Sequence, residues 1–249
     1  MNRLTGKTAL VTGGGQGVGH CPGVVRRGRA GGRRRRTLVP LEATCAQIRA
    51  RGGEALAVVC DVTQAQAIEQ CVAQVLEAFG TIDILVNNAQ IVPLDRLLEV
   101  SDEAFAQVMD SGPLATLRLM RACHPYLRGG GVVVNLASSA AVRWDACGYG
   151  AYAAAKEAIR CLSRAAACKW GPDGIRVNVI APHALSPELE GWMQAHPQEA
   201  EAFLQGIPLR RVGDCENDIG RTVAWLASDE AGYLTGATLP LDGGQAFWG

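Results

Sequence analysis

Short apolar runs alternate with segments of helical periodicity over most of the chain, and this alternation constrains the fold more than any other feature. The apolar runs lie at Thr8–Gly13, Ala55–Val62, Ile82–Asn88, Gly131–Ser139, Ile175–Pro182 and Leu239–Gly244. Helical patterns cover Gln64–Phe79, Asp102–Leu127, Tyr149–Trp170 and Asn217–Ala227. Such alternation is typical of β-α-β units. The sequence therefore predicts an α/β fold, a doubly wound parallel sheet with helices on both faces in three αβα layers.

Helix starts and the absence of linkers complete this prediction. Ser101, followed by Asp102 and Glu103, predicts the start of one helix, and Asp61 or Thr63 is expected to cap another. No linker, internal repeat or second composition regime divides the sequence. We therefore expect residues 1–249 to form a single domain.

Composition excludes several classes of protein. Hydrophobic residues make up 48% of the chain, and 24 basic residues balance 24 acidic ones, which does not favour nucleic acid or an anionic membrane as partner. No apolar run approaches the roughly 20 residues of a membrane span, and the first twelve residues lack the pattern of a signal peptide. The nine cysteines include no CxxC pair and no Cys/His cluster with metal-ligand spacing. We expect a cytoplasmic protein with reduced, mostly buried thiols and no metal site.

Three groups of residues after predicted strands suggest chemistry. Glycines at 13, 14, 15, 17 and 19 let a backbone approach a pyrophosphate, although glycine-rich turns are common in other loops. Tyr152 and Lys156 lie four residues apart, on one face of a helix, where an ammonium can lower the pKa of a phenol. In isolation, a chance combination of tyrosine and lysine on an exposed helix is the preferred interpretation of this pair. Ser138 and Ser139 end a strand, where serines usually serve as caps or turn residues.

Together these motifs resemble the classical short-chain dehydrogenase/reductase family over nearly the whole chain. Thr12–Gly19 (TGGGQGVG) is similar to the family's TGxxxGxG loop, and Asn87–Ala89 (NNA) to its NNAG. Ser139, Tyr152 and Lys156 match its catalytic set, while GIRVNVIAP and Arg211–Gly244 resemble later segments. The resemblance implies a Rossmann-type fold and hydride transfer between NAD or NADP and a secondary alcohol or ketone, a 3-oxoacyl thioester being one family-level possibility.

The resemblance also implies roles for individual residues. Tyr152 would exchange a proton with the substrate oxygen, Ser139 would polarise that oxygen, and Lys156 would lower the phenol pKa and bind the nicotinamide ribose. Asp61 would contact the adenine edge, Asn88 the adenosine ribose and Ile180 the nicotinamide pocket. The implied cofactor-binding set is Gly13, Gly15, Gln16, Gly17, Val18, Gly19, Asp61, Val62, Asn88, Ala89, Lys156, Pro182 and His183.

Three positions depart from the family pattern. Gly112 stands where the family usually has an Asn that bends a helix and holds a proton-relay water. Gln90 and His183 each replace a Gly beside the cofactor. A role for His183 in reading a polar substrate group is conceivable, but a solvent-facing loop histidine is the simpler expectation.

A fourth departure is the stretch His20–Pro40, which contains seven arginines and four glycines where an apolar helix and strand are expected. One interpretation is a basic flap that clamps the 2′-phosphate of NADP or binds nucleic acid, and another is a solvated, mobile segment. We favour a third, a local frameshift. If the arginine codons are CGN and each following codon begins with C or G, the other frame encodes only Val, Ala, Asp, Glu or Gly. The residue that would select NAD or NADP is then overwritten.

The leading hypothesis is an NAD(P)-dependent oxidoreductase acting on a small-molecule alcohol or ketone. The alternative is a non-catalytic member, a subunit or binding scaffold impaired by the altered first β-α-β unit and Gly112. A nucleic-acid-binding role through the arginines ranks third. Family members are commonly tetramers, so a homotetramer or dimer packed through Leu114–Leu127 and Ala153–Ala167 is expected. Trp144–Gly150 and His183–Gln205 are expected to determine the substrate.

Overall fold

The computed structural model describes residues 4–14, 29–31, 38–144 and 148–248; for residues 29–31 and 38–40 it describes the backbone alone. The arginine-rich segment, including the proposed flap, therefore lies largely outside the described residues. The same holds for Gly15, Gln16, Gly17, Val18 and Gly19.

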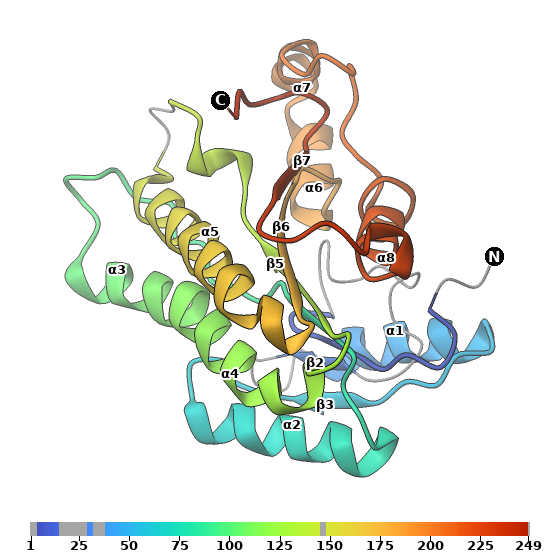
Figure 1. Ribbon diagram of the computed structural model, residues 1–249. Coiled ribbons are helices and arrows are strands. Elements are labelled where there is room, and N and C mark those ends of the chain that lie inside the picture. The colour runs from blue at the N-terminus through green and yellow to red at the C-terminus, as the bar shows by residue number, and fades with distance from the viewer. Residues whose placement is uncertain (1–3, 15–28, 32–37, 145–147, 249) are drawn as a thin grey trace.

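A parallel sheet forms the centre of the molecule (Figure 1). Its five strands run in the order β1 (Ala9–Val11), β4 (Ile84–Asn87), β5 (Val132–Leu136), β6 (Arg176–Pro182) and β7 (Thr238–Leu241). Two further strands, β2 (Arg29–Gly31) and β3 (Ala57–Val59), pair in parallel with each other, and β2 also contacts β1. The chain thus places β2 and β3 on one side of β1, and then returns to place β4, β5, β6 and β7 on the other side.

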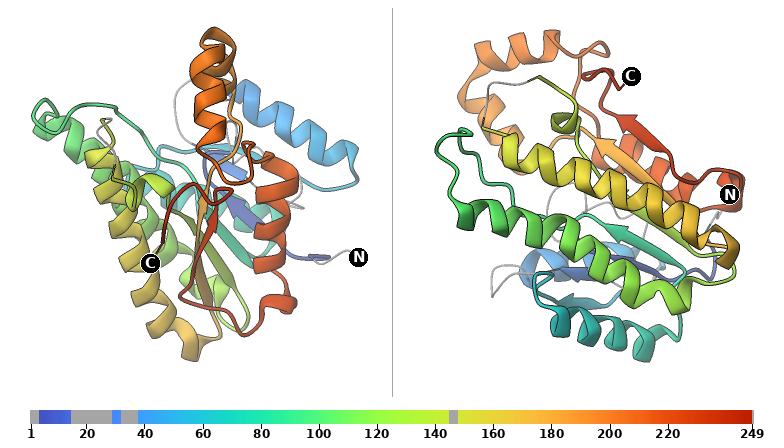
Figure 2. Two further views of the ribbon diagram at one scale, coloured as in Figure 1. Left: turned by 90° about the horizontal axis from the view of Figure 1, so that it is seen from above. Right: turned by 60° about the vertical axis from the view of Figure 1, so that its left-hand side comes forward.

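Alternate side chains of the strands pack into two separate cores. Leu10, Leu85 and Val133 are neighbours in register and face α2 (Ala65–Phe79) and α4 (Ala115–Leu127). Val11, Val86 and Val134 point to the opposite face, toward α1 (Leu38–Ala50) and α8 (Arg221–Leu226). Since successive residues of a strand point to opposite faces, continuous apolar runs require cover on both sides. Figure 2 shows the sheet between these two helix layers, which confirms the predicted doubly wound αβα fold.

Of the remaining helices, one packs on the face of the sheet against β5 and β6, and others lie at one end of the sheet. α5 (Gly150–Trp170) and α3 (Asp102–Met109) lie beside α4, whereas α6 (Pro187–Ala195) and α7 (Pro197–Gln205) stand beyond the carboxyl end of β6 (Figure 1). Each of the six predicted apolar runs overlaps a strand, and each of the four predicted helical segments contains a helix. β2, α1, α6 and α7 were not predicted, because none of them carries a clear apolar periodicity.

Two local expectations need correction. The predicted helix Asp102–Leu127 is interrupted by a π-helical segment, η2 (Asp110–Leu114), which contains Pro113, a residue without the N–H that an α-helix requires. Neither Asp61 nor Thr63 caps α2. Its first flanking residue is Gln64, which makes no side-chain cap, while Asp61 Oδ1 instead accepts a hydrogen bond from the Thr63 N–H. Ser101 does cap α3, by accepting from the Ala104 N–H at 3.1 Å.

Most cysteines of the described ranges are buried, as expected, namely Cys45, Cys60, Cys71 and Cys123. None of the helices of the described residues is both long and apolar enough to span a membrane.

Candidate active site

The parallel sheet places four loops along one edge. β1, β4, β5 and β6 run in the same direction, so the residues that follow them lie at a common end of the sheet. Those residues are Gly13, Asn88, Ser138 and His183. β1 has β4 on one side and contacts β2 on the other, so the direction of the chain's progress reverses beside it. In doubly wound sheets, ligands bind in the crevice at such a reversal.

The loops after β1 and β4 are joined by hydrogen bonds. Thr12 Oγ1 accepts from the backbone N–H groups of Asn88 at 2.9 Å and Ala89 at 3.0 Å. Asn88 Nδ2 donates in return to the carbonyls of Thr12 at 3.0 Å and Gly13 at 3.3 Å. Gly13 has a φ of 67°, and a Cβ there would lie 2.5 Å from Asn88 Nδ2. A glycine is therefore required at position 13 for these two loops to approach each other.

Asp61 and Val62 follow β3 and behave differently. Val62 is buried in the core, so its side chain supports the loop. Asp61 is exposed, and its Oδ1 is held by the Thr63 hydroxyl at 2.7 Å. Ile180 is completely buried in the second core, beneath the sheet edge.

Lys156 is anchored in the interior at the end of β5. Its side chain is 4% exposed and its Nζ donates to the Leu136 carbonyl oxygen at 2.7 Å. The same nitrogen lies 5.3 Å from the centroid of the Tyr152 ring, so α5 places both side chains on one face, as the spacing predicts. Burial lowers the pKa of Lys156 to about 7. The hydrogen bond to a carbonyl favours the ammonium, but loss of hydration outweighs it.

The pKa of Tyr152 differs from the sequence-based expectation. Burial raises the pKa of the phenol to about 12, a hydrogen bond with the Ser138 side chain lowers it in part, and Tyr149 raises it. Lys156 faces the ring of Tyr152 and is itself pushed toward the neutral form. In this structure it therefore does not produce the lowered phenol pKa that we expected.

The two serines after β5 have different partners. Ser138 lies beside the phenol and caps the short helix η3 (Ser139–Ala141) by accepting from the Ala140 N–H at 3.2 Å. Ser139 is buried, and its hydroxyl donates to Oε1 of Gln245 at 3.2 Å. Sequence reasoning missed Gln245, because a contact between residues more than a hundred positions apart leaves no local pattern.

His183 is not the solvent-facing residue that we expected. Its ring lies edge-on to Phe203 of α7, with centroids 5.4 Å apart, and its Nδ1 is buried without a hydrogen-bond partner among the described residues. Burial lowers the pKa of His183, and the Arg143 charge adds to this effect, so the imidazole favours its neutral form.

A cavity of about 730 Å³ opens beside His183. Its volume falls in the range of typical small-molecule sites. The wall combines three segments that are distant in sequence: His183; Pro208, Leu209, Arg211, Gly213 and Asp218; and Pro240 to Gly244 with Ala246, Phe247 and Trp248.

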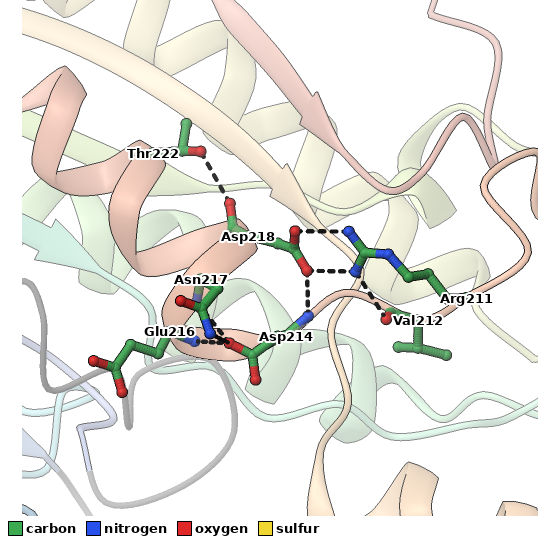
Figure 3. Close-up of polar contacts among 7 residues, drawn as sticks. All are labelled: Arg211, Val212, Asp214, Glu216, Asn217, Asp218 and Thr222. Carbon is green, nitrogen blue, oxygen red and sulfur yellow. Dashed lines mark hydrogen bonds and ion pairs between the residues drawn. The ribbon is translucent and has the colours of Figure 1, made fainter.

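The loop between α7 and α8 forms the polar side of this cavity (Figure 3). The Arg211 guanidinium donates to both oxygens of the Asp218 carboxylate, at 2.5 and 2.8 Å, which lowers the pKa of Asp218 to about 2. Asp214 caps the following π-helical turn, η5 (Cys215–Gly220), by accepting from the N–H groups of Glu216 and Asn217. The Gly213 N–H donates to the His183 carbonyl at 3.2 Å, which joins this loop to the end of β6.

The C-terminal segment is held against the same site. One carboxylate, that of the buried Asp242, accepts from the N–H groups of Gly244 at 3.0 Å and Ala246 at 3.2 Å and from Trp248 Nε1 at 3.3 Å. The Arg160 guanidinium of α5 lies 4.9 Å from the Trp248 ring, a cation–π arrangement. Gln245 is thereby presented to Ser139.

A family model described as enoyl-(acyl carrier protein) reductase, which represents short-chain dehydrogenases/reductases, matches residues 37–246. The chain belongs to the short-chain dehydrogenase/reductase family. The match begins directly after the arginine-rich stretch.

Relatives of known activity and solved structures agree with this membership. A 12α-hydroxysteroid dehydrogenase from a Clostridium species is 38% identical over 98% of each chain. A short-chain dehydrogenase from Burkholderia cenocepacia, solved in complex with NADP, superposes with a TM-score of 0.88 at 29% identity, covering 98% of this chain and 99% of that one. A 7α-hydroxysteroid dehydrogenase solved with NADH and 7-oxo glycochenodeoxycholic acid gives a TM-score of 0.87 at 29% identity, covering 98% and 96%.

This short-chain dehydrogenase/reductase is therefore an NAD(P)-dependent oxidoreductase that transfers a hydride between a nicotinamide cofactor and an alcohol or ketone. The matching proteins are dehydrogenases and reductases, and nothing in them favours the non-catalytic alternative.

Proposed function

We propose that Tyr152 is the acid/base of this oxidoreductase and that the substrate is a secondary alcohol, or the matching ketone, on a bulky and largely apolar skeleton. The observation that carries the proposal is the Tyr152–Lys156 pair at the carboxyl edge of the sheet, in which Lys156 is buried and Tyr152 half-buried. A tyrosine and a lysine on an exposed helix would not be desolvated in this way.

The elevated phenol pKa favours the reductive direction at neutral pH. With a pKa of about 12, Tyr152 carries its proton and can donate it from Oη to an oxygen that gains negative charge. The reverse reaction requires the phenol to lose that proton first, so oxidation accelerates as the pH rises. A nicotinamide bound at this edge supplies or accepts the hydride. The Ser138 side chain is the neighbour whose hydrogen bond favours the phenolate, and a protonated Lys156 adds to this only where the pH lies below its own pKa of about 7.

The described part of the cofactor site fits a dinucleotide. Position 13 tolerates no Cβ, and the Thr12–Asn88 hydrogen bonds hold the loops after β1 and β4 close together. We assign Gly13, Asn88 and Ala89 to the adenosine side and Asp61 to the adenine edge. Pro182, His183 and Lys156 complete the set on the nicotinamide side. The assignment of Gly15 to Gly19 stays a prediction, and Val62 acts as a support.

The cavity beside His183 supports the choice of substrate. Proline, leucine, phenylalanine and tryptophan side chains supply much of its wall, which suits a rigid hydrocarbon framework better than a polyol. Two of the similar proteins are hydroxysteroid dehydrogenases. A hydroxysteroid is therefore the first substrate class to test, with a 3-oxoacyl thioester second and a sugar alcohol third.

A direct experiment combines binding and turnover. Fluorescence titrations with NADH and NADPH establish which cofactor binds, and initial rates with the three substrate classes establish preference. We expect Tyr152→Phe to lower kcat by about 10²–10⁴-fold, the usual value of a positioned acid or base, while cofactor binding persists. Tyr233→Phe, at a fully exposed tyrosine, is the matched control. Unchanged turnover in Tyr152→Phe would refute the assignment.

Ser138 and Ser139 are proposed to divide two tasks. Ser139 would turn from Gln245 to hydrogen-bond the substrate oxygen, whereas Ser138 stabilises the Tyr152 phenolate. Ser139→Ala should then lower kcat by about 10²-fold across the pH range. Ser138→Ala should move the pH dependence of oxidation to higher pH, because the hydrogen bond that lowers the Tyr152 pKa is lost. Identical profiles for the two variants would contradict this division.

We also propose that subunits assemble through α4 and α5 into a dimer or tetramer, in the cytoplasm. The outer side of α5 exposes small residues, among them Ala154, Cys161 and Ala165, which allow close approach of another helix. Cys60, Cys71, Cys123, Cys161 and Cys168 form no disulfide, which suits a reducing compartment.

A further inference from the structure

Two departures from the family pattern meet in space. Gln90 lies in the loop after β4, and Gly112 lies in the π-helical segment η2. A Cβ placed on Gly112 would lie 2.6 Å from Gln90 Nε2 and 2.8 Å from Gln90 Cδ. The Gln90 carboxamide therefore occupies the volume that a side chain at position 112 would take.

The Gln90 carboxamide is buried and lacks a protein partner. Both Nε2 and Oε1 are inaccessible to solvent, and neither hydrogen-bonds to any of the described residues. An amide without hydrogen bonds in an apolar interior is costly, and proteins usually satisfy such a group with an ordered water. Neighbouring polar groups are already bonded to one another: the Ile91 N–H donates to Ser111 Oγ at 3.2 Å, and Ser111 Oγ donates to the Gln107 carbonyl at 2.7 Å. Nε2 and Oε1 of Gln90 therefore remain available to a water.

The turn that carries Gly112 packs directly on the catalytic helix. η2 contacts α5, and Val108 forms a small buried cluster with Ala151 and Ala155, the residues that immediately precede Tyr152 and Lys156. The Lys156 ammonium has three N–H donors, of which one is used on the Leu136 carbonyl. An acceptor on the η2 side would serve the remaining donors.

We propose that Gln90 is a positioning residue that supplies, from the loop after β4, the carboxamide that position 112 lacks, and that it orders water between η2 and the Lys156 ammonium. Gly112 is needed because only a residue without a side chain leaves room for this amide. The two departures thus form one compensating pair. The inference rests on the proposed roles of Tyr152 and Lys156.

Three variants test the pair. Gln90→Ala removes the amide, and we expect kcat to fall about tenfold or more while the KM for cofactor stays within about twofold, because Lys156 loses its placement. Gly112→Ala should produce a similar fall by displacing the amide, although alanine favours a helix and should not lower the melting temperature. Gln90→Ala combined with Gly112→Asn restores an amide at the same place, and kcat should return to within about threefold of the parent.

A second readout separates positioning from packing. Titration of the phenolate absorbance, taken as the difference between the protein and its Tyr152→Phe variant, reports the pKa of Tyr152 without turnover. The groups that face this phenol are Lys156 and Tyr149 on α5 and Ser138 after β5, whereas Asp110 of η2 is exposed. We expect Gln90→Ala to raise the Tyr152 pKa and the double variant to reverse that change.

Gly191→Asn, at a helical glycine with open space around it, controls for the effect of asparagine on helix stability. The inference is overturned if Gln90→Ala keeps the parent kcat and Tyr152 pKa, or if the double variant is no better than Gln90→Ala. Should Tyr152→Phe retain turnover, the proposed function itself fails, and the two failures are therefore distinguishable.

Discussion

At the scale of single residues, the interior of this site holds ionisable groups whose charged forms are better solvated in water. Lys156 is almost fully buried and its pKa falls to about 7, while the pKa of the neighbouring Tyr152 rises to about 12. Both shifts have burial as their largest cause. A charge held at such a site costs folding free energy, and active sites commonly bear this cost because the reaction needs the charge.

This cost predicts the effect of removing the lysine. Because the folded-state pKa of Lys156 lies near 7, below its ordinary value of 10.5, the folded protein resists protonation of this group. The penalty is complete below about pH 7 and disappears as the pH rises past the unfolded value. Lys156→Met should therefore raise the melting temperature by about 4 °C or more near neutrality, with a smaller gain at alkaline pH, while kcat is lost.

The matched control for this comparison is Lys169→Met, at an exposed lysine of the same helix, which should change the melting temperature little. Thermal melts of the three proteins across the pH range provide the measurement. An equal or lower melting temperature for Lys156→Met at neutral pH would show that the ammonium is better solvated than its burial implies.

At the scale of elements, short segments with strong local hydrogen bonding position the cavity wall. Arg211 and Asp218 close the loop before α8, and the Asp214 cap starts the π-helical turn η5. Arg51, at the end of α1, bridges to Glu216 of that turn at 2.6 Å. The wall is therefore tied both within itself and to α1, which lies in the same helix layer as α8.

The Arg211–Asp218 pair predicts a stability change at acid pH. The folded-state pKa of Asp218 is about 2, against an ordinary value of 3.8, so the pair stabilises the fold fully above about pH 4. This contribution declines as the pH falls toward 2. Asp218→Asn should lower the urea midpoint at neutral pH and raise the KM for substrate, and its difference from the parent should vanish at low pH.

Glu77→Gln, at an exposed acid of α2, controls for the loss of one surface charge. A difference between Asp218→Asn and the parent that stayed constant from neutral to acid pH would contradict the linkage. An unchanged KM would mean that the loop does not shape the substrate cavity.

At the scale of the whole molecule, the sequence predicted the elements that have a local residue pattern. It did not predict contacts between residues that are distant along the chain. The central strands were predictable because runs such as Val132–Leu136 are apolar on both faces. The Tyr152–Lys156 pair was predictable because helix geometry fixes its spacing. β2 was not, because Arg29–Gly31 has no apolar pattern and obtains its place by pairing with β3. The Gln90–Gly112 contact and the Ser139–Gln245 contact have no local signal at all.

The proposed oligomer depends on the outer side of α5. If α5 packs against a partner subunit, Ala165→Arg should disperse the oligomer into smaller species, because a long charged side chain replaces a small one on the contacting face. Ala73→Arg, on the exposed side of α2, should leave the assembly intact. Size-exclusion chromatography with light scattering measures both. A parent protein that elutes as a monomer would refute the proposed interface.

The Asp242 carboxylate, which accepts hydrogen bonds from Gly244, Ala246 and Trp248, makes the segment 242–248 a structural part of the site. Displacing this segment would disturb Gln245 and Trp248, and through them Ser139 and Arg160. A truncation before Gly243 should lower turnover even where the Rossmann core still folds.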